Sequence, residues 1–435
     1  MVYSLRYHPP PLPSLMTPDS TTILIVGAGP TGLACAISLV TNGVNPQDIA
    51  IIDAQAQGLN LSRAIAIHAK TVEELETLGC SEKLLSQGIF NHVMRFCAGR
   101  TVLLTADFPT LAARTRYPFT LTIAQTDTER VLEERLLELG VSVHRPLRLV
   151  DLKGISDGIE VTFEGGRTMK TKFLIGADGS RSMVRSLSGI LYRDPISGED
   201  PYNDAARARS HQEKPLALGD VHFSGDVPSS LSNRVYLGPR GLLLVVRLPD
   251  KPNSKPIYRL GCTVEPGTKD VSKEMLQDGL RVGLELSEHD TPKIESVMTA
   301  SAFHVRYALA DQFYRSLGGG AVVLVGDAAH IHSPAGGQGM NLGIRDSIQL
   351  GRVLANVIPE TKSNDTIPAV ALEALERYSV ERRPLALQVI KMTKTLTRIV
   401  LIENTFIRTV RNIVLWALGR IPSSGKALAL KLSGL

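Results

Sequence analysis

The sequence is poor in the residues that mark several common protein classes. Aromatic residues make up 5% of the 435 positions, with a single tryptophan, and only four cysteines are present. The cysteines lie far apart and no two have the spacing of metal ligands, which excludes a disulfide scaffold and indicates a reducing compartment. No run of about 18 apolar residues occurs, so we expect no membrane-spanning helix.

What is present indicates a chain with a sizeable core. Hydrophobic residues make up 43% of the positions, which excludes general disorder and suits one large domain or two ordinary ones. The net charge of +5 is unevenly distributed. Residues 382–435 contain ten basic residues and one acidic residue, so the rest of the chain carries −4. Any anionic partner is expected at the C-terminal region, and no motif indicates nucleic-acid binding.

The N-terminal part has the pattern of a nucleotide-binding unit. Residues 1–20 contain five prolines and predict a flexible leader. An apolar strand at 22–26, a glycine turn, a helix at 33–42 and a strand at 49–52 form a βαβ pattern. A further helix is predicted at 127–139, with Thr128 as its cap.

Later segments alternate between strand and helix signals. Strands at 159–163 and 169–175 flank a glycine turn and predict a hairpin, and 221–264 predicts a mostly antiparallel sheet. A buried strand follows at 321–325. Everything from Ala371 to Pro422 reads as helix.

The first chemical motif is the segment Gly27-Ala28-Gly29-Pro30-Thr31-Gly32, a G-x-G-x-x-G pattern between a strand and a helix. Gly27 permits the tight turn, Gly29 the approach of a pyrophosphate, and Gly32 close helix–strand packing. The helix N-terminus supplies N–H groups for the phosphates. Asp53, 21 residues beyond Gly32, is placed to accept ribose hydroxyls. This motif predicts dinucleotide binding but does not distinguish NAD from FAD.

Two further segments resemble one family. Residues 176–185 match D-G-x-x-S-x-x-R from Asp178 to Arg185, and residues 326–341 match G-D-A-A-H-x-x-x-P-x-G-G-x-G-x-N. Together with the first motif they are similar to the class A flavoprotein monooxygenases, which include p-hydroxybenzoate and phenol hydroxylases. The resemblance covers residues 21 to about 385. The residues after Pro384 are too few and too helical for the thioredoxin-like domain of some relatives.

The resemblance implies an α/β fold in which a Rossmann-like FAD-binding domain is interleaved with a mostly antiparallel substrate sheet. On that basis FAD-binding segments are expected at 21–200 and 318–370, the substrate sheet at 201–317, and a basic helical region at 371–435. Beyond the first motif, the positions expected to contact FAD are Arg63, Gln125, Arg130, Asp178, Asp327, Gly337, Gly339, Met340 and Asn341.

Several of these positions have more specific implied roles. Asp327 is expected to bind the ribitol or pyrophosphate, and Gly337 to Asn341 to pass backbone N–H groups beneath the isoalloxazine. Pro334 is expected near the reactive edge of the flavin. His68 is a candidate base or substrate contact, although a structural histidine is the favoured interpretation.

The implied activity is that of a single-component monooxygenase. FAD reduced by NADH or NADPH reacts with dioxygen to give a C4a-hydroperoxide, which hydroxylates or epoxidises an apolar aromatic, polyketide or terpenoid compound. The alternatives are an FAD-dependent oxidoreductase that inserts no oxygen and a non-catalytic FAD-binding protein. A metal site at His330 and His332 is disfavoured because no carboxylate or cysteine cluster completes it.

Residues 391–418 form an amphipathic pattern with apolar and basic arcs on opposite sides. The favoured interpretation is a helix, or a pair of helices, packed on the body with its cations outward. The alternative is a helix that lies on an anionic membrane. We therefore expect a cytoplasmic protein, with peripheral membrane contact as the alternative and the oligomeric state left open.

Overall fold

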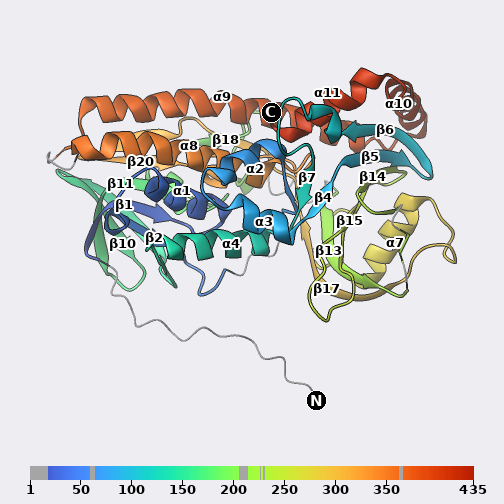
Figure 1. Ribbon diagram of the computed structural model, residues 1–435, viewed down its shortest axis with the longest axis horizontal. Coiled ribbons are helices and arrows are strands. Elements are labelled where there is room, and N and C mark those ends of the chain that lie inside the picture. Colours follow the sequence, from blue (N-terminus) through green and yellow to red (C-terminus); the bar gives the residue numbers. More distant parts are fainter. Residues whose placement is uncertain (1–17, 59–63, 205–213, 226, 229–230, 362–365) are drawn as a thin grey trace, which may run out of the picture.

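The computed structural model describes residues 18–58, 64–204, 214–225, 227–228, 231–361 and 366–435. Figure 1 shows two β-sheets side by side, with the long helices α8 (Gln338–Thr361) and α9 (Ala369–Val400) running together over one of them. Helices α10 (Thr405–Leu418) and α11 (Pro422–Ser433) lie beside the edge of the other sheet. This arrangement confirms the predicted α/β class, and the predicted leader lies almost wholly outside the described residues.

The first sheet contains the nucleotide-binding pattern. Its strands follow the order β19-β20-β11-β1-β2-β8, and the hairpin β9–β10 extends from β11. The bounds are β1 Ser20–Val26, β2 Ile49–Ile52, β8 Val143–His144, β9 Leu149–Ile155, β10 Gly158–Phe163, β11 Thr168–Gly176, β19 Tyr314–Leu317 and β20 Gly320–Leu324. β1, β2, β8, β11 and β20 are parallel, which suits their continuous apolar runs because both faces of such a sheet are buried. The predicted βαβ unit and the predicted hairpin are both present.

The second sheet has the order β17-β13-β16-β15-β14-β5-β6. Its bounds are β5 Val93–Ala98, β6 Thr101–Asp107, β13 Leu216–Phe223, β14 Arg234–Gly238, β15 Gly241–Arg247, β16 Tyr258–Thr263 and β17 Ile294–Phe303, with α7 (Lys273–Leu284) packed on one face. The sheet is antiparallel except where β14 pairs with β5. The predicted range 201–317 is therefore corrected: two strands come from 93–107, and 314–317 joins the first sheet. A parallel pair so distant in sequence leaves no local pattern.

Shorter elements complete the described fold. They are α1 Pro30–Thr41, η1 Pro46–Asp48, β3 Ala66–Ile67, α2 Ala69–Glu76, α3 Ser81–Gln87, β4 Ile89–Asn91, η2 Phe108–Leu111, β7 Thr120–Thr122, α4 Gln125–Glu138, α5 Met183–Leu187, β12 Tyr192–Arg193, β18 Ala308–Ala310, η4 Gly326–Ala328 and β21 His330–Ile331. Thr128 does not cap α4, because that helix already begins at Gln125. The Thr128 hydroxyl instead donates back to the carbonyl of Ala124.

The C-terminal helices differ from the prediction in one place. The segment 391–418 belongs to a pair of helices, α9 and α10, as one form of the prediction had it, and the side chain of Asn404 accepts the N–H of Ile407 and caps the second helix. Pro422 does not end the helical region but begins α11, since proline suits the first position of a helix. Among the described residues, no helix is both long enough and apolar enough to cross a bilayer.

Candidate cofactor site

The turn between β1 and α1 uses its glycines in two ways. A side chain at Gly27, whose φ is +103°, would collide with the carbonyl oxygen of Ala177, and one at Gly32 would collide with the carbonyl oxygen of Gly27. These two glycines therefore allow the backbone to pack against itself. Gly29 differs, because no atom lies within 4 Å of the place where its Cβ would be. The turn is closed on its inner side and open at Gly29.

The open side of this turn is suited to an anion. Gly29 precedes α1, offers no side chain to its first N–H groups, and the first turn of the helix contains no acidic residue. The positive end of the helix dipole is therefore left uncompensated by the chain. At the end of β2, the Asp53 carboxylate accepts the N–H of Ala28 at 2.8 Å and that of Gln55 at 2.8 Å. Each carboxylate oxygen retains a lone pair for a further donor.

In the Asp-Gly loop after β11, the acidic side chain forms hydrogen bonds within the loop and with the helix that follows it. Asp178 accepts the hydroxyl of Ser182 at 2.5 Å and the N–H groups of Met183 and Val184 at 2.8 and 3.2 Å, so it caps α5. Burial raises the pKa of this carboxyl, although these hydrogen bonds oppose the rise. The structure thus gives Asp178 a role in shaping the loop, and a contact with FAD stays a prediction.

Arg185 links this loop to the Gly-Asp loop that follows β20. Its guanidinium donates to the carbonyls of Ala328 at 2.9 Å and Ser180 at 3.0 Å, and it lies 3.8 Å from the ring centre of Tyr192. The Tyr192 hydroxyl in turn donates to the carbonyl of Asp327 at 3.0 Å. The Asp327 side chain, in the loop after β20, is exposed. Two motifs about 150 residues apart are therefore held together.

Thr31 brings the first motif into the same place. A Cβ at Gly326, which has φ +58°, would lie 2.8 Å from the Thr31 side chain, and one at Gly343 would lie 2.8 Å from its hydroxyl. Only glycine permits this approach of α1 to the loop and to α8. The three motifs consequently meet beyond the carboxyl ends of the adjacent strands β1, β11 and β20, where open α/β sheets bind their ligands.

Asn341 fastens the beginning of α8 to residues 66–68. Its amide nitrogen donates to the carbonyls of Ala66 at 2.8 Å and Gly337 at 2.7 Å, and its oxygen accepts the N–H of His68 at 2.8 Å. The side chain is fully buried. Pro334 and Gly337 are exposed on the loop, Met340 is half-buried, and Gly339 faces open space. The loop is held by hydrogen bonds on its inner side and is accessible on its outer side.

His68 is buried beneath this loop. Its Nε2 lies 2.8 Å from the carbonyl oxygen of Gly336, and desolvation lowers the pKa of the imidazole to about 4. The ring is therefore neutral at pH 7, and its Nε2–H donates to the loop. Its Nδ1 is buried and has no partner among the described residues. This geometry favours the structural interpretation of His68 over that of a base.

Gln125 and Arg130 occupy different sides of α4. Gln125 accepts the N–H of Ala64 at 3.2 Å and donates to Glu129 at 2.9 Å, so it faces the segment beside Arg63. Arg130 is exposed and binds Glu134 at 2.9 Å. Five residues along a helix turn a side chain well away from the starting face, whereas four keep it there. The described ion pairs of Arg130 are with Asp127 and Glu134 of the same helix, so a contact with FAD stays a prediction, and Arg63 lies outside the described residues.

The comparisons with known proteins agree with this geometry. A family model described as "FAD binding domain" matches residues 20–393. The chain is 30% identical over 384 residues to the 12-dehydrotetracycline 5-monooxygenase/anhydrotetracycline 6-monooxygenase of Streptomyces rimosus, covering 86% of this chain and 68% of that protein. The chain belongs to the class A FAD-dependent aromatic hydroxylases.

Other relatives extend the comparison. Pentachlorophenol 4-monooxygenase of Sphingobium chlorophenolicum is 29% identical over 87% of this chain, which spans 65% of that protein. The structure of an anhydrotetracycline hydroxylase from Streptomyces rimosus has a TM-score of 0.71 and 28% identity, covering 96% of this chain and 76% of the other. The p-nitrophenol 4-monooxygenase of Pseudomonas putida, at 23% identity and TM-score 0.76, covers 95% and 99% and shares the fold. This hydroxylase is thus an FAD-dependent monooxygenase that spans about two thirds of its curated relatives.

The described residues of the hydroxylase fit FAD. Space is open in front of Gly29 and Gly339, where a side chain would otherwise stand. Neither α1 nor α8 carries an acidic residue in its first turn, so both N-termini present positive dipole ends. Asp53 directly follows β2, and Asp327 lies in η4, the short helix after β20. A pyrophosphate flanked by two hydroxyl-bearing groups matches this set of donors and acceptors.

A buried charge network behind the Gly-Asp loop was not predicted. Asp346 on α8 lies 2.6 Å from His330 Nε2 and 2.5 Å from the guanidinium of Arg382 on α9. Burial alone would raise the pKa of Asp346, but the charge of Arg382 and the hydrogen bonds from His330 and Arg382 outweigh it and hold the pKa low. An acid in the apolar helix at 342–357 is a signal that a buried partner is needed. Sequence alone does not identify that partner.

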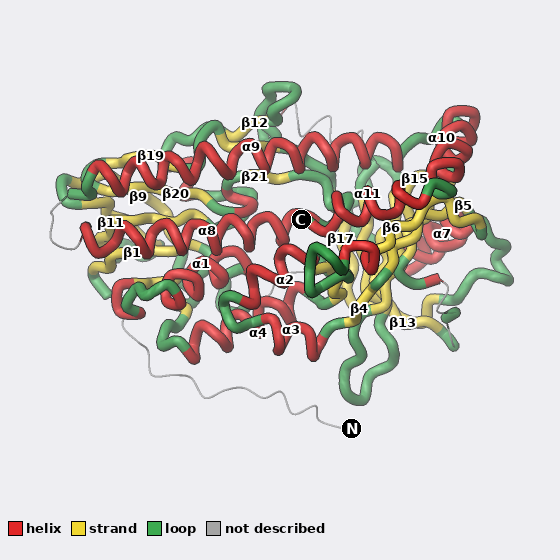
Figure 2. The backbone as a smooth tube through the Cα atoms, turned by 45° about the horizontal axis from the view of Figure 1, so that its top comes forward, coloured by secondary structure: helices red, strands yellow, loops and turns green. Residues whose placement is uncertain are grey.

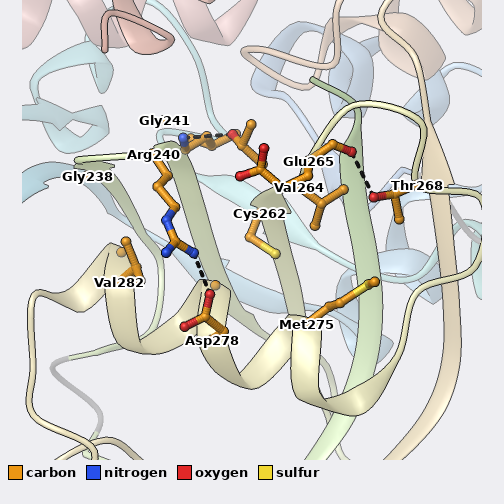
Figure 3. Close-up of a pocket in the computed structure, with 14 residues that line it drawn as sticks. Gly238, Arg240, Gly241, Cys262, Val264, Glu265, Thr268, Met275, Asp278 and Val282 are labelled. Carbon is orange, nitrogen blue, oxygen red and sulfur yellow. Dashed lines mark hydrogen bonds and ion pairs between the residues drawn. The ribbon is translucent and has the colours of Figure 1, made fainter. Parts of the chain in front are cut away.

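The hollow in Figure 3 lies elsewhere, between β15, β16 and α7. Arg240 and Asp278 pair across its edge at 2.5 Å, and Cys262 and Met275 line its interior. Its volume is about 110 Å³, whereas small-molecule sites measure ~300 Å³ or more. This hollow shares no residue with the three motifs, so we assign it no part in cofactor binding.

Proposed function

We propose that this hydroxylase takes electrons from NADH or NADPH and inserts one atom of dioxygen into a neutral, apolar aromatic or polyketide-like substrate, with terpenoids as a further candidate class. The observation that carries the proposal is the meeting of three motifs beyond β1, β11 and β20. The printed names of the relatives, which include tetracycline and pentachlorophenol monooxygenases, support the substrate class.

The chain's own groups divide the binding of FAD among them. The N–H groups at the start of α1, exposed past Gly29, would hold the pyrophosphate, and Asp53 would accept ribose hydroxyls. Asp327 would accept ribitol hydroxyls or approach the pyrophosphate through its loop. The backbone from Gly337 to Asn341 would lie under the isoalloxazine. When bound and reduced, FAD supplies the activation of dioxygen.

The remaining task of the protein is to position the substrate and exclude water. Asn341 and neutral His68 fix the inner side of the loop without presenting a charge, which keeps Pro334 and Gly337 in one arrangement at its outer side. Such fixed dipoles are most effective where water is absent. His68 is accordingly proposed as a positioning residue.

The second sheet supplies the argument for a neutral substrate. The face of this sheet opposite α7 carries apolar residues such as Leu237, which packs against Leu415 of α10, and it also carries Arg259, which is 2% exposed. Asp220 binds this guanidinium through two hydrogen bonds of 2.7 Å. Because Asp220 balances the charge of Arg259, this pair does not require an ionised substrate. An apolar substrate of this kind also partitions into lipid, so contact of the enzyme with a membrane would bring it to its substrate.

Oxidation of NADH and NADPH, measured with and without a panel of apolar aromatics, tests the proposal. We expect one of the two nucleotides to be consumed faster when a substrate is present, with less hydrogen peroxide formed per nucleotide. Oxidation that yields stoichiometric peroxide whatever is added would support the oxidoreductase without oxygen insertion. No oxidation at all by FAD-loaded protein would support the non-catalytic alternative.

A further inference from the structure

Helix α10 faces the opposite way from the favoured prediction. Its apolar side points to solvent: Phe406 is 77% exposed and Ile413 60%. The exposed apolar residues along this helix and just beyond it are Phe406, Ile407, Val410, Ile413, Val414, Trp416, Ala417, Leu418 and Ile421. Arg411, which was expected to point outward, is buried instead. We call the exposed set the α10 apolar face.

Arg411 explains this orientation. Its guanidinium donates to the carbonyls of Ile399 and Val400 at 3.1 and 3.3 Å, which are among the last carbonyls of α9, and to that of Leu237 on β14 at 3.1 Å. The last carbonyls of a helix have no partners within it, so a buried arginine suits them. Rotating α10 to bury its apolar face would leave these carbonyls and the cation without their partners.

Close packing fixes the same orientation. Leu415 packs among Leu103, Val235 and Leu237 on the inner side of α10. A side chain at Gly419 would collide with the carbonyl oxygen of Leu103, so the end of the helix rests directly on β6. Figures 1 and 2 both show α10 at one extremity of the molecule, beyond the second sheet. The α10 apolar face is therefore held outward at a protruding end.

We propose that the α10 apolar face inserts into the surface of an anionic membrane. The residues around it have the required charge: Arg398, Arg420 and Lys426 are exposed, and Glu403 is paired with Lys214 at 2.8 Å. The Arg420 guanidinium lies 4.0 Å from the ring centre of Trp416. Apolar side chains flanked by cations and a tryptophan are the composition of helices that lie in the headgroup region.

The geometry favours lying on the membrane over spanning it. At ~1.5 Å per residue, the 14 residues of α10 extend about 21 Å, which is shorter than the ~30 Å hydrocarbon core. The charge favours a membrane over a second copy of the chain. A twofold dimer would place this face and its basic rim against themselves, and like charges would then oppose each other.

Helix α11 connects the α10 apolar face to the loop that carries Pro334 and Gly336. α11 follows α10 directly, and the Leu432 carbonyl near its end accepts the side-chain amide of Gln338 at 2.9 Å. A Cβ on Gly336 would lie 3.3 Å from the Leu432 side chain. A membrane-bound α10 would thus hold the loop that carries Pro334 at a fixed distance from the lipid surface. Binding itself does not depend on which substrate the enzyme oxidises.

Trp416 is the only tryptophan, so its fluorescence reports on this surface alone. The FAD-loaded enzyme is mixed with vesicles of phosphatidylcholine, with and without phosphatidylserine. We expect a blue shift of the emission, quenching by brominated lipid, and binding at least about tenfold tighter to the anionic vesicles, since each nearby cation contributes at low salt. Added salt should weaken the binding.

Matched substitutions separate this surface from general hydrophobicity. Phe406→Glu or Ile413→Glu should reduce vesicle binding at least about tenfold. Val380→Glu is the control, because Val380 is 66% exposed on α9, about 30 Å along the helix from its end. Flavin content confirms that each variant is folded.

Two results would overturn the proposal. The first is an unchanged Trp416 emission with vesicles, or equal loss of binding in all three variants. The second is a wild-type dimer, seen by sedimentation velocity, in which Trp416 is already shielded without lipid and which Phe406→Glu dissociates.

Discussion

Helices α8 and α10 bury opposite kinds of surface. α8 encloses Asn341 and Asp346 within the first core, surrounded by apolar side chains, and both polar groups have partners there. α10 buries the side chain of Arg411 and leaves those of Phe406 and Ile413 exposed to solvent. Both helices have one apolar side and one polar side. The difference lies in which side has partners within the protein.

The comparison shows that a buried hydrogen-bonding group can decide the orientation of a helix. The apolar side of α8 has a large core to enter, so its few polar groups are accommodated there. The inner side of α10 meets the unpaired carbonyls at the end of α9, which only a donor satisfies. Four experiments can break or sharpen this contrast between the cofactor end and the C-terminal end.

Two glycine substitutions should have the largest effects, and they should differ in kind. Gly32→Ala forces a methyl group into the carbonyl of Gly27 and should cost about 3 kcal/mol of unfolding free energy. Gly29→Ala meets no protein atom, so the stability of the apoprotein should change by less than about 0.5 kcal/mol. Its FAD affinity should fall at least about tenfold.

Chemical denaturation and FAD titration of both variants measure these effects. Unchanged FAD affinity in Gly29→Ala would mean that the pyrophosphate does not approach this turn.

Asp346→Asn should be nearly as damaging. The substitution leaves the buried Arg382 without its anionic partner and weakens the bond to His330, but the amide oxygen still accepts a hydrogen bond, so we expect a loss of about 2–3 kcal/mol in unfolding free energy. Asp278→Asn, at an exposed ion pair with Arg240, is the control and should cost less than about 1 kcal/mol. Equal losses in the two variants would show that burial of the α8 pair is unimportant.

Lowering the pH should destabilise the cofactor end through His68 and His332. Burial lowers the pKa of His68 and of His332 from 6.5 to about 4, so the unfolded chain binds protons first as the pH falls below 6.5. Stability present above pH 6.5 is thus lost on going down to pH 4, by up to about 3 kcal/mol for each ring.

Unfolding free energies measured between pH 7 and 4.5 give the slope of stability against pH. His68→Gln should reduce the slope by about half, and a slope equal to that of the wild type would argue against a buried neutral His68.

At the C-terminal end, Arg411→Met should cost about 1–3 kcal/mol by removing donors from buried carbonyls. Phe406→Glu should change unfolding free energy by less than about 0.5 kcal/mol, since the side chain is already in solvent. Thermal unfolding of both variants gives the order. A larger loss in Phe406→Glu would mean that the α10 apolar face is packed on the protein.

Sequence reasoning was most successful where sterics act locally. The turn at Gly27 to Gly32, the strand at 321–325 and the hairpin around Gly165 follow from short patterns and are present in the fold. The position of Arg130 was predictable from helical periodicity alone, because a residue five positions after Gln125 lies on another face.

Other features depend on contacts that no local pattern contains. Pairing of β14 with β5 joins Arg234 to Arg95 across about 140 residues. Asp346 finds Arg382 on a different helix. The orientation of α10 depends on the carbonyls of α9 and β14, which are supplied by the fold rather than by the sequence of α10 itself.

Oxygen insertion is tested most directly by running a substrate-stimulated reaction of the FAD-loaded enzyme under ¹⁸O₂ and measuring the mass of the product by mass spectrometry. A monooxygenase should give a product that carries one ¹⁸O atom, and the same reaction in H₂¹⁸O under ordinary oxygen should give an unlabelled one. A product without label from ¹⁸O₂, formed while the nucleotide is consumed, would contradict oxygen insertion by this chain.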